Sequence, residues 1–77
     1  MREFRRLSIP SRAHPLVKRL FEEMNRQQLG VFDMADRVGI NASTIKAWRV
    51  RTNPTIDSLQ ACFNVLGLEL KIRRLSE

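Results

Sequence analysis

The sequence predicts an all-α domain of four to five helices followed by one short β-strand. Apolar residues recur at helical spacing through most of residues 15–66, and glycines, prolines or capping residues mark the expected helix ends. In residues 68–75 the apolar residues alternate with charged ones up to residue 72, which is typical of a strand. With 77 residues the chain has room for one hydrophobic core, so we expect a single domain over residues 1–77.

The first helix is expected to run from Pro15 to about Gln28. Proline suits the first turn of a helix, where its missing N–H group is not needed. One face of this helix is expected to be apolar, with Leu16, Leu20, Phe21 and Met24, and the other charged, with Lys18, Arg19, Glu22, Glu23 and Arg26. The preceding residues 1–10 mix apolar and basic side chains, which fits either a basic arm or a short strand.

Two short helices joined by a tight turn are expected within residues 31–51. Gly30 interrupts the first helical pattern, and Gly39 can adopt the positive φ that ends the second helix, about residues 31–38. Asn41 can cap a third helix, about residues 42–50, by accepting a free backbone N–H. The apolar residues here are Met34, Ala35, Val38, Ile40, Ile45 and Trp48, and the helical spacing of Ile45 and Trp48 turns both towards the interior. The third helix is otherwise small or polar, so the segment predicts a helix-turn-helix, whose second helix enters the major groove of DNA.

A fourth helix is expected after a turn at Thr52, Asn53 and Pro54. Thr55 can cap this helix, and Gly67 can end it. Its apolar residues are Ile56, Leu59, Cys62, Phe63 and Leu66.

The alternating segment at residues 68–75 needs a partner, because a lone strand leaves its backbone groups unpaired. The partner is either the N-terminal segment or the same strand of a second subunit, which two-fold symmetry would place antiparallel. We favour the second arrangement, in which Leu68, Leu70 and Ile72 form the interface of a homodimer.

The amino-acid composition indicates which class of molecule the protein binds. Fourteen Lys and Arg against eight Asp and Glu give a net charge of +6, which is typical of nucleic-acid binders, although other basic proteins share it. The single Cys62 is expected to be a buried small hydrophobe. No apolar run approaches the roughly 18–20 residues of a membrane span. We therefore expect no membrane partner and a cytoplasmic protein that associates with the nucleoid when it binds DNA.

Several short motifs occur together at a fixed spacing: Met34-Ala35, Val38-Gly39-Ile40-Asn41, Ser43-Thr44-Ile45, Trp48, Asn53-Pro54-Thr55, Leu59 and Leu66-Gly67. With them, residues 16–70 resemble the phage-repressor (Cro/Xre-type) helix-turn-helix family. The resemblance implies a sequence-specific transcriptional regulator, expected to be a repressor, that binds a double-stranded DNA operator as a dimer. The chain departs from the family at Val31, where a phosphate-contacting Gln is common. It departs again at residues 49–52, which lack the usual Glu and Gly.

The resemblance also assigns roles to residues of the third helix. The base-reading residues would be Ala42, Ser43, Lys46 and Ala47, and periodicity agrees because Ile45 and Trp48 point the other way. Phosphate contacts are expected from residues that follow the reading helix or lie at its start: Thr44, Arg49, Arg51, Thr52 and Asn53. Arg37 fits a phosphate contact or a solvated charge equally well. For Arg2, Arg5 and Arg6 we favour a solubilising or strand-edge cluster over an arm in the minor groove.

Two alternative functions fit parts of the sequence. The tail looks like that of some antitoxins in this family, so the chain could bind a toxin partner and also repress its own operon. Sequence-neutral binding driven by charge alone is a second alternative, with steep salt dependence. We expect no enzymatic activity and no cofactor, because no convincing carboxylate or Cys/His pair and no Gly-rich phosphate loop occurs. The one histidine, His14, is expected to cap a helix or lie at the surface.

Overall fold

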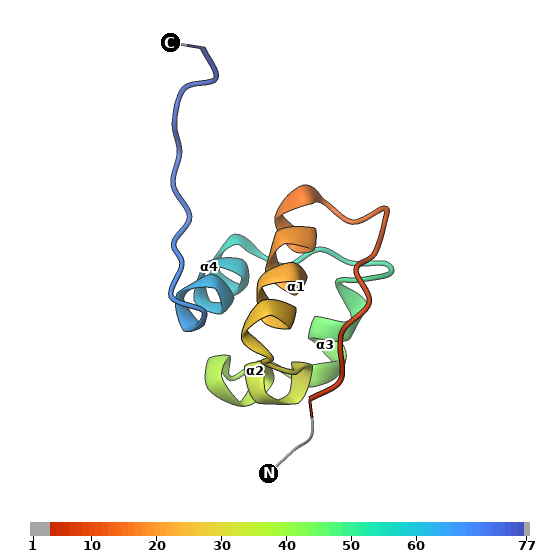
Figure 1. Ribbon diagram of the computed structural model, residues 1–77. Coiled ribbons are helices and arrows are strands. Elements are labelled where there is room, and N and C mark those ends of the chain that lie inside the picture. Colours follow the sequence, from red (N-terminus) through yellow and green to blue (C-terminus); the bar gives the residue numbers. More distant parts are fainter. Residues whose placement is uncertain (1–3, 77) are drawn as a thin grey trace.

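The computed structural model describes residues 4–76, and these residues form four helices and no strand (Figure 1). The helices are α1 (Pro15–Gln27), α2 (Val31–Val38), α3 (Ala42–Ala47) and α4 (Ile56–Val65). Helix α2 packs against both α3 and α4, and α1 packs against α4. The small all-helical fold is therefore confirmed. The core contains Val17, Leu20, Phe21, Met24, Val31, Met34, Ala35, Ile45, Trp48, Leu59, Cys62, Phe63 and Leu66.

Helix α1 begins with a side-chain cap and ends at a left-handed residue. The Nδ1 atom of His14 accepts a hydrogen bond from the Leu16 N–H at 3.0 Å, so His14 is a helix cap. Gln28 has a φ of 57°, which ends the helix one residue before the predicted boundary. The first turn presents Val17 to the core, whereas Leu16 is 40% exposed.

The prediction that Glu23 lies on the solvent-facing side of α1 is wrong, because its side chain is only 1% exposed. The carboxylate accepts hydrogen bonds from Arg26 and from Gln27 (2.7 Å), and also from Arg19 (3.0 Å). These neighbours, Arg26 first and then Gln27, lower the pKa of Glu23 to about 2. Gln27 also donates to the carbonyl of Leu66 at 2.8 Å, so the cluster joins α1 to the end of α4.

Because the pKa of Glu23 is lowered in the fold, the fold should lose stability at acid pH. A carboxyl group with a pKa of about 2 in the folded chain and 4.5 as its ordinary value stabilises the fold above about pH 4.5. That contribution is lost as the pH falls from 4.5 towards 2. We expect Glu23→Gln to remove part of the acid destabilisation in urea titrations between these pH values, and Glu22→Gln, at an exposed position on the same helix, to leave it unchanged. Equal acid profiles of the two variants would contradict the role of Glu23.

Helix α2 has its predicted bounds, and α3 ends three residues earlier than predicted. Gly39 ends α2 with a φ of 74°, as expected, and its N–H donates to the Ala35 carbonyl at 2.8 Å. Asn41 precedes α3 but makes no side-chain capping bond, so that detail of the prediction is wrong. After α3, the N–H groups of residues 50, 51 and 52 all donate to the carbonyl of Ala47, at 3.0–3.2 Å. Because these three N–H groups converge on one carbonyl, the regular helical hydrogen-bond pattern does not continue beyond Ala47.

The fourth helix follows the prediction at its start. Thr55 caps α4 by accepting a hydrogen bond from the Ser58 N–H at 3.1 Å. Gly67 follows the helix with a φ of 81°, and the N–H of Leu68 donates to the Phe63 carbonyl at 2.8 Å. The chain then leaves the helical body.

The two ends of the described chain lie on opposite sides of the helical body (Figure 1). Residues 68–76 extend away beside α4 without forming a strand, so the predicted C-terminal strand is absent from this single chain. A strand is defined by hydrogen bonds to a neighbouring strand, and no other segment of residues 4–76 supplies them. Pairing of the tail with the N-terminal segment, one of the two predicted alternatives, is wrong because that segment runs past α1 and α3. Within residues 4–76, no helix is long and apolar enough to cross a membrane.

A buried asparagine fastens the N-terminal segment to α1. The side chain of Asn25, 8% exposed, accepts from the Leu7 N–H at 2.7 Å and donates to the Leu7 carbonyl at 2.9 Å. The amide thus pairs with both backbone groups of Leu7, as a neighbouring strand would. These two hydrogen bonds hold the N-terminal segment against α1 at Leu7.

Loss of this amide should destabilise the fold. We expect Asn25→Ala to lower the free energy of unfolding by about 1–3 kcal/mol, because two backbone groups lose their partners. The control is Asn64→Ala, at an exposed asparagine on α4. Urea denaturation measures the free energy of unfolding of both variants. If Asn25→Ala were no less stable than Asn64→Ala, the hydrogen bonds between Asn25 and Leu7 would contribute nothing to stability.

Candidate nucleic-acid interface

Helix α3 presents its polar residues to solvent and its large apolar residues to the core. Ile45 is fully buried and Trp48 is 4% exposed, which confirms the prediction that Trp48 is a core residue. Ser43, Thr44 and Lys46 are exposed on the remaining surface. The predicted base-reading alanines, Ala42 and Ala47, are only partly exposed, and Ala42 packs against the core. Of the four predicted base-reading residues, Ser43 and Lys46 are therefore the most accessible.

Phe32 orients the lysine of α3, a role that the sequence did not indicate. Its ring is 52% exposed, and the Lys46 ammonium lies 4.6 Å from the ring centroid. A cation over an aromatic face is attracted by the ring quadrupole. The only signal in the sequence is that Phe32 falls out of phase with the apolar residues Met34 and Ala35.

Arg49 is held towards the N-terminal segment. Its guanidinium lies 5.6 Å from the centroid of the Phe21 ring and donates to the Ser8 hydroxyl at 3.3 Å. The side chain is partly buried, unlike that of Arg51. Of the predicted phosphate-binding arginines, Arg51 is thus the one held least by its surroundings.

The turn after α3 gathers several cations at one hollow. Arg49, Arg51, Thr52 and Asn53 line a hollow of about 210 Å³, and Arg12 from the loop before α1 lines it too. Within residues 4–76, none of the three arginines pairs with a carboxylate. Arg12 was missed by the sequence prediction because only the fold brings it near residues 49–53. The loop before α1 carries no local pattern that would reveal this contact.

The start of α2 lacks a side-chain cap. Val31 is only 5% exposed, so its side chain does not replace the phosphate-contacting glutamine of the resembled family. Gly30, at the N-cap position of α2, has no side chain that could accept a hydrogen bond from this helix.

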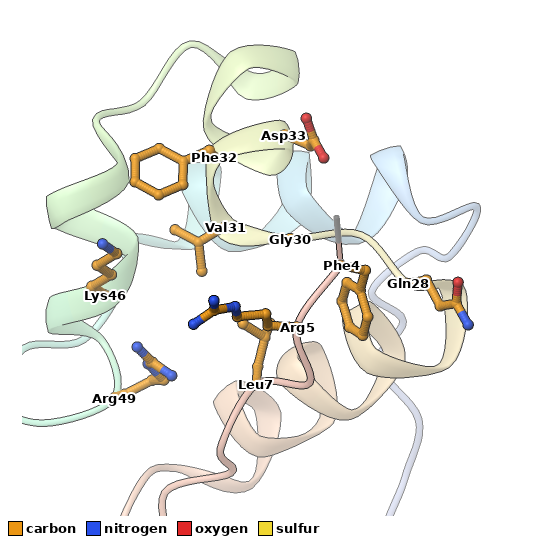
Figure 2. A pocket seen from close by; sticks show the side chains of 10 residues that line it. All are labelled: Phe4, Arg5, Leu7, Gln28, Gly30, Val31, Phe32, Asp33, Lys46 and Arg49. Carbon is orange, nitrogen blue, oxygen red and sulfur yellow. The ribbon is translucent and has the colours of Figure 1, made fainter. Parts of the chain in front are cut away.

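A pocket of about 290 Å³ lies between the N-terminal segment, the start of α2 and α3 (Figure 2). Figure 2 shows the side chains of Arg5, Lys46 and Arg49 gathered around its opening. Val31 and Phe32 line the same space from α2.

The three residues of the tail that were predicted to form the dimer interface differ in their exposure to solvent. Leu68 and Leu70 are partly buried against the helical body, whereas Ile72 is fully exposed at 101%. A groove of about 530 Å³ runs between the tail and the body, lined by Leu16, Phe63, Leu68, Leu70 and Ile72 among others. Apolar surface of this kind is unfavourable in water.

The single cysteine is a core residue, as predicted. Cys62 is fully buried, and burial raises the pKa of its thiol to about 11. A thiol of this kind is unreactive. Within the described part of the chain, no group of three or more His, Cys, Asp or Glu residues could hold a metal ion.

Compared with family models, with curated proteins and with solved structures, the chain has no significant match.

Proposed function

We propose that the protein is a sequence-specific double-stranded DNA-binding regulator of the Cro/Xre type, acting as a dimeric repressor with α3 in the major groove. The observation that supports this most is the surface of α3. Ser43, Thr44 and Lys46 are exposed directly after the tight turn at Gly39, while Ile45 on the other face anchors the helix. Residues near the start of a reading helix are the ones that reach base edges.

The exposed side chains suit base recognition. The Lys46 ammonium can donate to O6 or N7 of guanine, and the Ser43 hydroxyl can donate or accept. The partly exposed Ala42 and Ala47 offer methyl groups that pack on the C5-methyl of thymine. Because only two of these groups form hydrogen bonds, DNA shape would contribute to specificity.

The cations beside α3 suit phosphate binding. Arg51, Thr52 and Asn53 follow α3 at the surface, and Arg12 lies at the same hollow. Cations without a carboxylate partner can neutralise phosphates at no cost in broken ion pairs. Arg49 would join them on leaving Ser8.

The tail supports a dimer. Residues 68–75 place an apolar row of Leu68, Leu70 and Ile72 on an extended segment that has no strand partner among residues 4–76. An antiparallel pair of tails would satisfy the backbone groups and cover Ile72 in each subunit. The two copies of α3 would then enter successive major grooves about 34 Å apart.

Selection from a randomised duplex pool tests the proposal. The purified chain is mixed with the pool near physiological salt, and bound DNA is sequenced over several rounds. We expect enrichment of a palindrome whose half-sites lie about one helical turn apart. Binding without any enriched sequence, lost steeply with added salt, would refute base recognition and favour neutral binding by charge.

A further inference from the structure

The pocket between the N-terminal segment, α2 and α3 combines apolar walls with basic groups (Figure 2). Leu7, Val31 and Phe32 supply apolar surface, and Phe32 is half exposed although it is large and hydrophobic. Concave sites lined by apolar side chains with a few polar groups are typical of small-molecule binding. A hollow of about 290 Å³ is at the lower end of the range of about 300–1,000 Å³ for drug-sized ligands, so its ligand would be small.

Of the described residues, three cations line this pocket, Arg5, Lys46 and Arg49, against one carboxylate, that of Asp33. Within residues 4–76, none of the three cations pairs with a carboxylate. The lining therefore carries a net positive charge, and two of these cations, Lys46 on α3 and Arg49 in the turn after it, are already oriented by Phe32 and by Ser8. Preorientation reduces the entropy that a bound anion would cost.

We propose that this pocket binds a small aromatic carboxylate of one or two rings. The rings would pack on Val31 and Phe32, and the carboxylate would accept hydrogen bonds from Lys46 and Arg49. The guanidinium of Arg49 has the planar shape that matches a carboxylate. Inorganic phosphate would leave the apolar walls uncovered, and a neutral aromatic molecule would leave the cations without a partner. An aromatic acid satisfies both sets of groups.

If the protein binds DNA as proposed above, a ligand in this pocket would regulate that binding. Lys46 is also a proposed base-reading residue, and its ammonium cannot serve a bound carboxylate and a guanine edge together. Ligand and operator therefore compete, and each lowers the affinity of the other. The aromatic acid acts as an inducer that releases the protein from DNA.

Binding is tested first without DNA. Naphthalene-2-carboxylate is titrated into the full chain and followed by isothermal calorimetry and by amide shifts in NMR. We expect saturable binding with shifts concentrated at residues 5–8, 30–33 and 46–49. Naphthalene-2-carboxamide and inorganic phosphate should each bind at least tenfold more weakly, because each lacks one of the two interactions. Absence of binding at millimolar acid, or equal binding of either comparison compound, would overturn the proposal.

Matched variants locate the site. We expect Phe32→Ala and Lys46→Gln each to weaken binding of the acid about tenfold. Ile56→Ala and Lys18→Gln, an exposed apolar residue on α4 and a lysine of α1 outside the pocket, should leave it unchanged. Because Phe32 and Lys46 are both exposed, their substitution leaves the core intact, and thermal unfolding verifies this. Equal affinities of all four variants would overturn the assignment.

A competition experiment separates this inference from the proposed function. Addition of the acid should reduce binding of the selected operator by wild-type protein and have a smaller effect on Phe32→Ala. If the chain binds the acid but no DNA sequence, the pocket stands and the proposed function fails. Simultaneous binding of acid and operator without loss of affinity would overturn the regulatory role.

Discussion

Removal of residues 68–77 should convert the protein to a monomer and weaken operator binding by about a hundredfold or more. Two linked half-site contacts gain affinity because the second contact forms at a high effective concentration. A monomer loses that gain, although each α3 is unchanged. Sedimentation equilibrium reports the oligomeric state, and gel retardation with the selected palindrome and with one half-site reports the affinity. We expect the truncated chain to bind both DNAs with similar, weak affinity.

Point variants exclude a general effect of losing the tail. Ile72 is fully exposed in the single chain, so Ile72→Asp removes no contact within the subunit. It should nevertheless weaken the dimer, because it places a charge in the proposed apolar row. Ser76→Asp adds the same charge near the end of the tail and should leave the dimer intact. A truncated protein that remains dimeric would refute the pairing of tails. A monomeric full chain that co-purifies with a second protein through Ile72 would favour the antitoxin alternative.

The sequence predicted the helices best where local residues determine their ends. Gly39 and Gly67 take the positive φ that was expected of them, and Thr55 caps α4 through its own side chain. Such signals act over a few residues, so the sequence contains them in full. The α3 boundary was predicted less well, because the turn at Ala47 depends on three N–H groups that converge on one carbonyl. Nothing in the helical periodicity of residues 42–50 indicates that convergence.

The surroundings of the candidate site depend on contacts between distant residues. Asn25 holds Leu7 across eighteen positions, and Arg49 reaches Ser8 across forty-one. Periodicity places a residue on one side of a helix but cannot say which other segment covers that side. Glu23 shows the limit of helical periodicity as a predictor of burial. The periodicity predicted that its side chain faces solvent, yet Arg19, Arg26 and Gln27 surround the carboxylate in the fold. The pocket beside α3 exists for the same reason, since the N-terminal segment forms one of its walls.

Lys46→Ala should relax base preference at one operator position, while Arg51→Ala should weaken binding to every sequence. A lysine that donates to guanine favours the correct base by about 1–3 kcal/mol, and alanine loses that discrimination. A phosphate contact carries no sequence information, so loss of Arg51 lowers all affinities together. It should also reduce the slope of log affinity against log salt by about 1. Titrations of the operator and its single-base variants at several salt concentrations measure both effects.

Two comparisons sharpen this test. Phe32→Ala should reproduce part of the specificity loss of Lys46→Ala, because the ring that orients the ammonium is gone while the charge remains. Lys18→Ala removes an equal charge from α1 and should preserve base preference. If Lys46→Ala and Arg51→Ala lowered affinity equally across all sequences, α3 would contribute charge without reading bases. A loss of specificity shared by Lys46 and Phe32, and absent from Lys18, would instead place recognition at the residues where α2 and α3 meet.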